Sequence, residues 1–268
     1  MRLLFVGDIV GKPGRAILAR ALPRLVARDG IDFVVANVEN AAGGFGITRE
    51  TAEEIRKVGV HVMTTGNHVW DKKEALDYIG QEPRLLRPLN YPAGAPGTGS
   101  GIYASPSGVQ VAVVNAMGRV FMPLLDDPFA KLDAELARLR EQTPVIVVDF
   151  HAEVTSEKIA LAWHLDGRAS LVVGTHTHVA TADERVLPGG TACITDVGMT
   201  GPHDSVIGVE KAPAIARFLN GLPTKFETAK GDPRLNAVCV DVDPTSGRAT
   251  AIARVCVDEA ALAAWHET

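Results

Sequence analysis

Five short apolar runs along the chain each end at polar residues. The runs consist mainly of β-branched and other aliphatic side chains. Near-continuous apolar runs of this kind are typical of strands that are covered on both faces of a sheet. We therefore expect buried strands at residues 3–7, 33–38, 62–66, 145–150 and 170–173.

Helical patterns lie between these runs. Pro13 lies near a first helical turn, and apolar residues follow it at helical spacing until Gly30. Thr48 is a suitable N-cap for a helix that ends at Gly59. The alternation of strands and helices predicts a sheet with helices outside it. Further helices are expected over the apolar stripe 132–139, from a cap at Thr155 or Ser156 to Gly167, and from Pro213 through Ile215, Phe218 and Leu219 to Gly221.

The middle and the end of the chain follow a different pattern. Residues 90–108 are rich in Pro and Gly, which predicts a loop with at most a short strand at 102–104, and a further strand follows at 109–115. Residues 236–243 and 248–258 predict a hairpin. Strand pairs in both places favour two packed sheets with helices on the outer faces, in a single domain spanning residues 1–268.

Polar residues that can bind a metal follow each of the five predicted strands. Open α/β sheets bind their ligands outside the carboxyl ends of the strands, so we expect these side chains to share one rim. Carboxylates, amides and imidazoles suit transition metals, and this set exceeds the needs of one tetrahedral ion. The residues are Asp8, Glu39, Asn40, Asn67, His68, His151, His176 and His178.

Such a set suits two ions a few Å apart, with a carboxylate such as Glu39 between them. Two-metal sites promote in-line displacement at phosphorus, because they generate hydroxide near neutral pH and clamp the oxygens of the transition state. His68 directly follows Asn67 and need not be a ligand itself. With an ordinary pKa near 6.5, an imidazole there could protonate the leaving oxygen or bind a phosphate oxygen.

Other polar residues have simpler interpretations. Asp149 precedes His151 by two positions, and we expect it to support that histidine rather than bind metal. Arg119 follows a strand and is the one candidate for substrate contact, with a solvated arginine as the alternative. Glu153 and Glu157 are expected to be helix N-terminal charges. Asn37 is expected to face away from the neighbours of Glu39, and structural roles are expected for His61, His164, His203 and His266.

Charge and cysteine content narrow the function classes. The net charge is −5 and no block of Lys or Arg stands out, which argues against a duplex nucleic-acid footprint. The three cysteines are odd in number and include no CxxC pair, so we expect free thiols and a reducing cytoplasm. No signal-peptide pattern and no membrane-spanning stretch is evident.

Several motifs together resemble a known superfamily. Gly7-Asp8, Gly66-Asn67-His68, the strand-end His151 and Gly174-Thr175-His176-Thr177-His178 are similar to the motifs of calcineurin-like metallophosphoesterases. The resemblance narrows to the YmdB-like phosphodiesterases through three further segments, at residues 38–44, 149–158 and 195–202. Two departures from the broader superfamily belong to this branch: Ile9 and Val10 follow Asp8 in place of an Asp-x-His motif, and Glu39-Asn40 replaces a Gly-Asp pair.

The resemblance implies a four-layer αββα sandwich of two mixed sheets flanked by helices, and a dinuclear site of iron or manganese in a cytoplasmic bacterial protein. It implies that Glu39 bridges the two metals. It assigns Asp8, Glu39, Asn40 and His178 to one metal, and Glu39, Asn67, His151 and His176 to the other.

The leading functional hypothesis is a phosphodiesterase that hydrolyses 2′,3′- or 3′,5′-cyclic nucleotides, or similar diesters, by attack of a metal-bound hydroxide. Diesters are favoured over monoesters because no Arg/Lys cluster near the motifs would neutralise a second phosphate charge. One alternative is a metal-containing regulatory or nucleotide-binding protein with little turnover, and another is a mononuclear amide or ester hydrolase. An intact His68 beside the full ligand set favours the enzyme. The oligomeric state, including a homo-oligomer, stays open.

Overall fold

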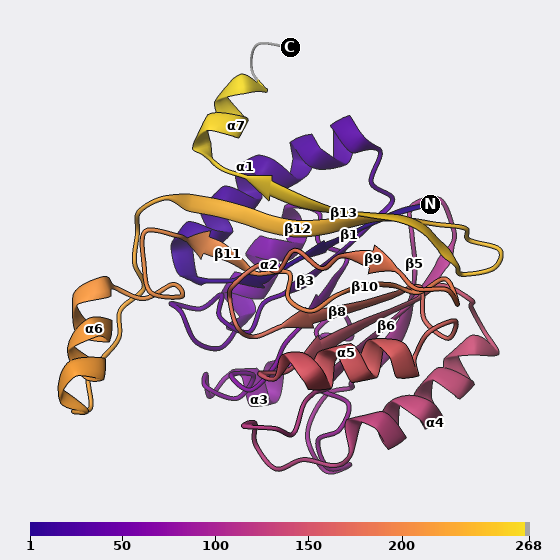
Figure 1. The fold of residues 1–268 in the computed structure, drawn as a ribbon, viewed down its shortest axis with the longest axis horizontal. Coiled ribbons are helices and arrows are strands. Elements are labelled where there is room, and N and C mark those ends of the chain that lie inside the picture. The colour runs from indigo at the N-terminus through magenta and orange to yellow at the C-terminus, as the bar shows by residue number, and fades with distance from the viewer. Residues whose placement is uncertain (266–268) are drawn as a thin grey trace.

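Two β-sheets pack face to face, and helices cover both outer faces (Figure 1). The structure is a computed structural model that describes residues 1–265. This arrangement confirms the two packed sheets that the sequence pattern predicts and the four-layer αββα sandwich that the resemblance implies.

Seven strands form the first sheet in the described chain, in the order β2-β11-β12-β1-β3-β4, with β13 paired to β12. β1 runs parallel to β3 and antiparallel to β12, and β3 runs parallel to β4. The strands are β1 (Arg2–Val6), β2 (Asp8–Ile9), β3 (Phe33–Asn37), β4 (Val62–Thr64), β11 (Met199–Pro202), β12 (Pro233–Val242) and β13 (Ala249–Val257).

The second sheet has six strands among the described residues, in the order β5-β6-β7-β8-β10-β9. Its central strands β6, β7, β8 and β10 are parallel to one another, so their carboxyl ends meet at one edge. The strands are β5 (Ser100–Ala104), β6 (Gln110–Met117), β7 (Ile146–His151), β8 (Leu171–Thr175), β9 (Arg185–Val186) and β10 (Ala192–Ile194).

Helices complete the outer layers. Helices α1 and α2 pack on the outer face of the first sheet, and α4 and α5 pack on the outer face of the second. The helices are α1 (Gly11–Asp29), α2 (Arg49–Lys57), α3 (Ala75–Tyr78), α4 (Pro128–Arg140), α5 (Thr155–His164), α6 (Lys211–Asn220) and α7 (Glu259–Ala264). None of these described helices is both long and apolar enough to cross a membrane.

The layers explain why the central strands are apolar on both faces. In β1, Leu4 and Val6 pack toward α1, whereas Leu3 and Phe5 pack between the two sheets. In β7, Val147 lies between the sheets and its neighbours belong to the cluster under α4 and α5. Successive side chains of a strand point to opposite faces, so a strand between two apolar layers needs apolar residues at every position.

Several predicted element ends are confirmed, whereas α2 ends at Lys57, before Gly59, and α6 begins at Lys211, before Pro213. Thr48 caps α2 in a capping box, and Gly30 ends α1 with a φ of +63°. Neither Thr155 nor Ser156 caps α5: the helix begins at Thr155 and follows Val154, which makes no side-chain cap bond. The helix also ends at His164, before the predicted Gly167.

Helix α6 forms where predicted, but its apolar side does not join the core. It projects from the body of the molecule (Figure 1), and Ala214 is its one buried residue. Phe218 and Leu219 are exposed. The periodicity of a helix predicts that one side is apolar but does not say what that side contacts.

The apolar pattern misses several short elements: β2, β9, β10, β11, α3 and α7. The pairing of β2 with β11 matters most, because Met199 and Thr200 pair with Asp8 and Ile9 and hold the first motif beside the first sheet. His266 lies outside the described residues.

Candidate metal centre

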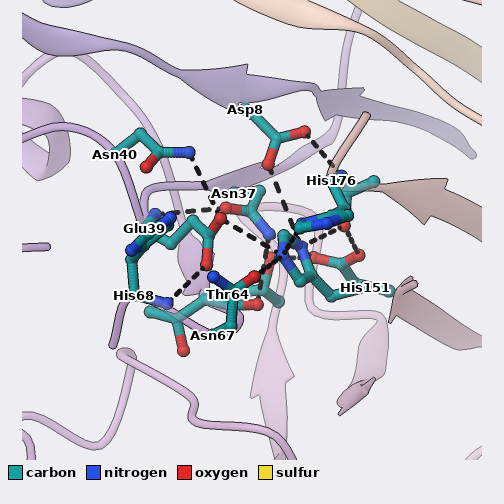
Figure 2. Close-up of polar contacts among 12 residues, drawn as sticks. Asp8, Asn37, Glu39, Asn40, Thr64, Asn67, His68, His151 and His176 are labelled. Atoms are coloured by element: carbon teal, nitrogen blue, oxygen red, sulfur yellow. Dashed lines mark hydrogen bonds and ion pairs between the residues drawn. The ribbon is translucent and has the colours of Figure 1, made fainter. Parts of the chain in front are cut away.

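The predicted site residues meet where the two sheets come together at the ends of their central strands (Figure 2). Asp8 begins β2, Glu39 and Asn40 follow β3, and Asn67 and His68 follow β4. From the second sheet, His151 ends β7, and His176 and His178 follow β8. The side chains of Asp8, Glu39, Asn40 and His151 are buried, and the other four are partly buried.

His151 Nε2 lies at the centre of three polar contacts. It is 3.1 Å from Glu39 Oε1, 3.0 Å from Asn67 Oδ1 and 3.0 Å from His176 Nδ1. One ring nitrogen carries at most one proton, so it cannot satisfy all three groups at once. Separations near 3 Å are those of neighbouring ligands around a metal with bonds of about 2.1 Å. The donor set therefore fits a cation.

A second group of contacts joins Glu39 to His178. The amide Nδ2 of Asn40 lies 3.2 Å from Glu39 Oε1 and 3.0 Å from His178 Nε2. His178 Nδ1 lies 2.7 Å from the carbonyl oxygen of Ile207 and donates its proton there, which leaves Nε2 with its lone pair. Glu39 Oε1 contacts both groups, as a bridging carboxylate would.

Asp8 supplies a buried oxygen that accepts no hydrogen bond from the described residues, although His151 Nδ1 lies 3.9 Å from it. Its carboxylate is fully buried, and Oδ1 makes no hydrogen bond with the described residues. Oδ2 accepts a bond from the backbone N–H of His176 at 3.3 Å. Burial raises the pKa of Asp8 well above its ordinary value, although the charge of His151 opposes this. A bound cation would satisfy the free oxygen and stabilise the ionised carboxylate.

Two titratable groups hold each other in their charged forms. Burial opposes ionisation of Glu39, but the charge and hydrogen bond of His151 lower the pKa of Glu39 to about 2. Burial also opposes protonation of His151, but Glu39 and Asp8 raise its pKa to about 9. Burial and the charge of His151 lower the pKa of His176 to about 3, so this imidazole is neutral, as a metal ligand must be. The proton on His151 thus occupies the place that a cation would take.

Asp149 supports His151 through a threonine, as predicted. His151 Nδ1 donates to Thr175 Oγ1 at 2.9 Å, and the Thr175 hydroxyl donates to Asp149 Oδ1 at 2.7 Å. This chain orients the ring so that Nε2 points into the site. The prediction for Asn37 is wrong, because Asn37 Oδ1 accepts from the backbone N–H of Glu39 and Asn37 Nδ2 donates to Asp149 (Figure 2). Asn37 is the last residue of β3, but its side chain reaches the turn that follows this strand.

His68 stands beside the ligand cluster. Its backbone N–H donates to Glu39 Oε2 at 3.0 Å, whereas its ring Nδ1 lies 2.8 Å from Asp71 Oδ2. The ring packs against Phe45 in a T-shaped arrangement, with the ring centroids 5.0 Å apart. The imidazole is therefore oriented by Asp71 and Phe45 and lines the cleft in front of the cluster.

Two of the histidines lie on a strained loop. His176 has a φ of +101° and His178 a φ of +65°, a region that residues with a side chain rarely adopt. Each such residue costs about 1–3 kcal/mol and persists only where the surrounding structure holds it. Strain of this kind is common at functional sites.

A cleft of about 340 Å³ opens over the cluster, a size suited to a small ligand. Its walls are partly apolar and partly polar, and no Lys or Arg is among the described residues that line it. The lining residues are Val10, Glu39, Asn40, Gly44, Phe45, His68, Glu153, His176, Thr177, His178, Ile207, Val209 and Phe226.

Arg119 is the candidate residue that the structure does not bring to this cleft. Its guanidinium lies 3.5 Å from Asp127. Its backbone N–H donates to Glu157, so that glutamate anchors a loop in addition to lying in the first turn of α5. Glu153, expected to be a helix charge only, lines the cleft, and its Oε2 lies 3.2 Å from His176 Nε2. The one signal in the sequence is its place two residues after His151.

Comparisons with known proteins find similar sequences and structures over nearly the whole chain. The family model of YmdB-like proteins matches residues 4–255. A 2',3'-cyclic-nucleotide 2'-phosphodiesterase of Bacillus subtilis (strain 168) is 48% identical over 259 residues, which cover 97% of this chain and 98% of the relative.

Two crystal structures share the fold. A hypothetical protein from Thermus thermophilus superposes with a TM-score of 0.90 at 45% identity, over 97% of this chain and 100% of the other. A novel phosphatase from Mycoplasma pneumoniae gives a TM-score of 0.90 at 34% identity, over 96% of this chain and 93% of the other. Together with the family match, these similarities show that the chain belongs to the family of YmdB-like proteins.

Proposed function

We propose that this protein is a phosphodiesterase that uses two metal ions, iron or manganese, and acts on cyclic nucleotides or similar diesters. The observation that carries the proposal is the unsatisfied donor set, in which three groups compete for His151 Nε2 and Asp8 Oδ1 accepts no hydrogen bond from the described residues. The name of the Bacillus subtilis relative supports the diester as substrate.

Two groups of residues would hold the ions, with Glu39 in both. When bound, the ions would activate water and stabilise negative charge on the phosphorus oxygens. We assign Asp8, Asn40 and His178 to one ion with Glu39. Asn67, His151 and His176 would hold the other with Glu39.

His68 would act as the proton donor to the leaving oxygen. Its Nδ1 faces Asp71, so Nε2 is the ring nitrogen free to carry a proton toward the substrate. Asp71 and Phe45 hold the ring in place beside the cleft. A positioned imidazole of this kind commonly contributes about 10²–10⁴-fold to the rate.

The walls of the cleft favour a nucleotide diester over a simple monoester. A diester carries one negative charge where a monoester carries nearly two at neutral pH, and the described lining residues include no Lys or Arg to neutralise a second charge. Phe45, Ile207 and Phe226 give the cleft aromatic and aliphatic surface on which a base can pack.

Metal content and substrate preference test the proposal together. Protein purified without chelator should contain close to two metal equivalents, and manganese should restore activity after chelation. The value of kcat/KM for bis-nitrophenyl phosphate should exceed that for nitrophenyl phosphate, and 2′,3′- and 3′,5′-cyclic nucleotides should be hydrolysed. Full activity with one equivalent or less would contradict the two-metal assignment, and a tenfold preference for the monoester would contradict the substrate class.

A further inference from the structure

A buried ion pair lies directly behind the strained histidine loop. We propose that Lys158 and Asp196 hold residues 174–178 in the conformation that presents His176 and His178 to the metals. The inference rests on the proposed function, because it takes these two histidines as ligands. Lys158 and Asp196 do not line the cleft, so they act as positioning residues.

Asp196 binds the loop through the residue between the two histidines. Its Oδ2 accepts hydrogen bonds from the backbone N–H of Thr177 at 3.1 Å and from the Thr177 hydroxyl at 2.8 Å. Its Oδ1 accepts from the backbone N–H of Gly198 at 2.8 Å. Thr177 is thus anchored at two atoms, while the residues on either side adopt left-handed backbone conformations.

Lys158 supplies the opposite charge from α5. Its Nζ lies 2.8 Å from Asp196 Oδ2, and both side chains are almost fully buried. The aliphatic stem of Lys158 passes against the strand that leads into the loop, because a Cβ on Gly174 would lie 2.8 Å from Lys158 Cδ. The same Cβ would lie 1.8 Å from the carbonyl oxygen of Thr195, so glycine is required for this close approach.

Global stability alone does not account for this pair. Desolvation of two charges offsets much of their attraction, and apolar replacements of buried pairs are often equally stable. Here the carboxylate also accepts three hydrogen bonds, two from Thr177 and one from the backbone N–H of Gly198. These bonds hold two turns whose residues His176, His178 and Gly198 have left-handed backbone conformations. The charged acceptor makes those bonds stronger than a neutral one would.

Four variants separate positioning from stability. Asp196→Asn removes the charged acceptor, and Lys158→Met removes the ammonium while keeping an unbranched stem. Thr177→Val removes only the hydroxyl contact. The matched control is Leu161→Ala, because Leu161 is fully buried on the same helix as Lys158 but packs in the apolar cluster under α4 and α5.

Metal affinity is the first readout, measured by competition with a chelator for Mn²⁺ at a temperature where every variant is folded. Asp196→Asn should weaken Mn²⁺ binding about 10- to 100-fold, the usual scale for losing a group that orients a ligand. Lys158→Met and Thr177→Val should cause smaller losses, because loop donors to Asp196 remain. Leu161→Ala should lower Tm without changing affinity. Equal affinity in Asp196→Asn and wild type would overturn the proposal.

Hydrogen exchange of the metal-free protein is the second readout. Asp196→Asn should increase exchange across residues 174–178 and leave the His151 segment protected, whereas Leu161→Ala should leave the loop as in wild type. Unchanged loop protection in Asp196→Asn would overturn the proposal. A wild-type protein that binds no Mn²⁺ would instead contradict the proposed function, and the exchange experiment would still decide whether the pair holds the loop.

Discussion

The site holds its histidines in two different ways. His151 is the last residue of a regular strand, fully buried, and its ring is oriented by Thr175 and Asp149. His176 and His178 lie on a loop with left-handed backbone and are partly exposed. The first is positioned by the pairing of β7 with its neighbours, whereas the others depend on a contact from Asp196, distant in the sequence.

The difference lies in what fixes the backbone at each histidine: regular sheet pairing at His151, and contacts from outside the loop at His176 and His178. A strand end is fixed by hydrogen bonds along the sheet and by packing on both of its faces. A strained loop keeps its shape only when other groups hold it, so the two histidines on it are the ones most easily displaced. The centre thus combines one rigid imidazole with two whose placement depends on tertiary contacts.

The largest effect that we expect comes from a residue outside both regions. His68→Ala should lower kcat about 10²–10⁴-fold, the scale for loss of a general acid, while metal content stays near the wild-type value. The loss should shrink for substrates with nitrophenyl leaving groups, which need little protonation. Elemental analysis and turnover of good and poor leaving groups measure both effects. Loss of metal in this variant would make His68 a ligand and contradict the assigned role.

The site could be predicted from the sequence where residues follow strands directly. Asp8, Glu39, Asn67, His151 and His176 each lie just after or at the end of a strand, and parallel strand ends converge for general reasons. The layered architecture could also be predicted, because strands that are apolar at successive positions must be covered on both faces of their sheet.

Other features depend on contacts between distant residues and leave no local pattern. The partnership of Lys158 with Asp196 and the reach of Glu153 toward His176 are of this kind. The short strand β11 is another, because it is defined by pairing with β2 and β12 rather than by its own composition. The exposure of α6 is also of this kind, because the spacing of its apolar residues predicts a helix but not whether that helix packs against the core.

A smaller effect should follow when the support of His151 is removed. Thr175→Val deletes the hydroxyl between His151 Nδ1 and Asp149 and should weaken metal binding about 10- to 100-fold. Hydrogen exchange in the loop of His176 and His178 should stay unchanged. Thr64→Val is the matched control, because the Thr64 hydroxyl donates to the same Asp149 and is not the hydroxyl to which His151 Nδ1 donates. Equal losses of affinity in the two variants would show that the effect comes from Asp149 and not from the orientation of His151.

The smallest effect concerns a histidine that serves the fold alone. His61 Nδ1 accepts a hydrogen bond from the backbone N–H of Val34 at 3.1 Å, and its ring stacks on Phe33. Burial and the nearby charge of Arg84 lower the pKa of His61 in the folded protein. The unfolded chain therefore binds this proton first, so as pH falls below about 6.5 the contribution of His61 to stability is lost.

His61→Asn keeps an acceptor at the position of Nδ1 and removes the titration. For metal-free protein unfolded with urea between pH 7.5 and 5.5, the free energy of unfolding should fall less steeply in the variant than in wild type. The difference in slope is at most one proton, or about 1.4 kcal/mol per pH unit. Subtracting the two curves cancels the titrations of His151, His176 and His178, which both proteins share. Parallel curves would show that the pKa of His61 is the same in the folded and the unfolded protein. The sensitivity of the fold to acid would then come from the histidines and carboxylates of the candidate metal centre.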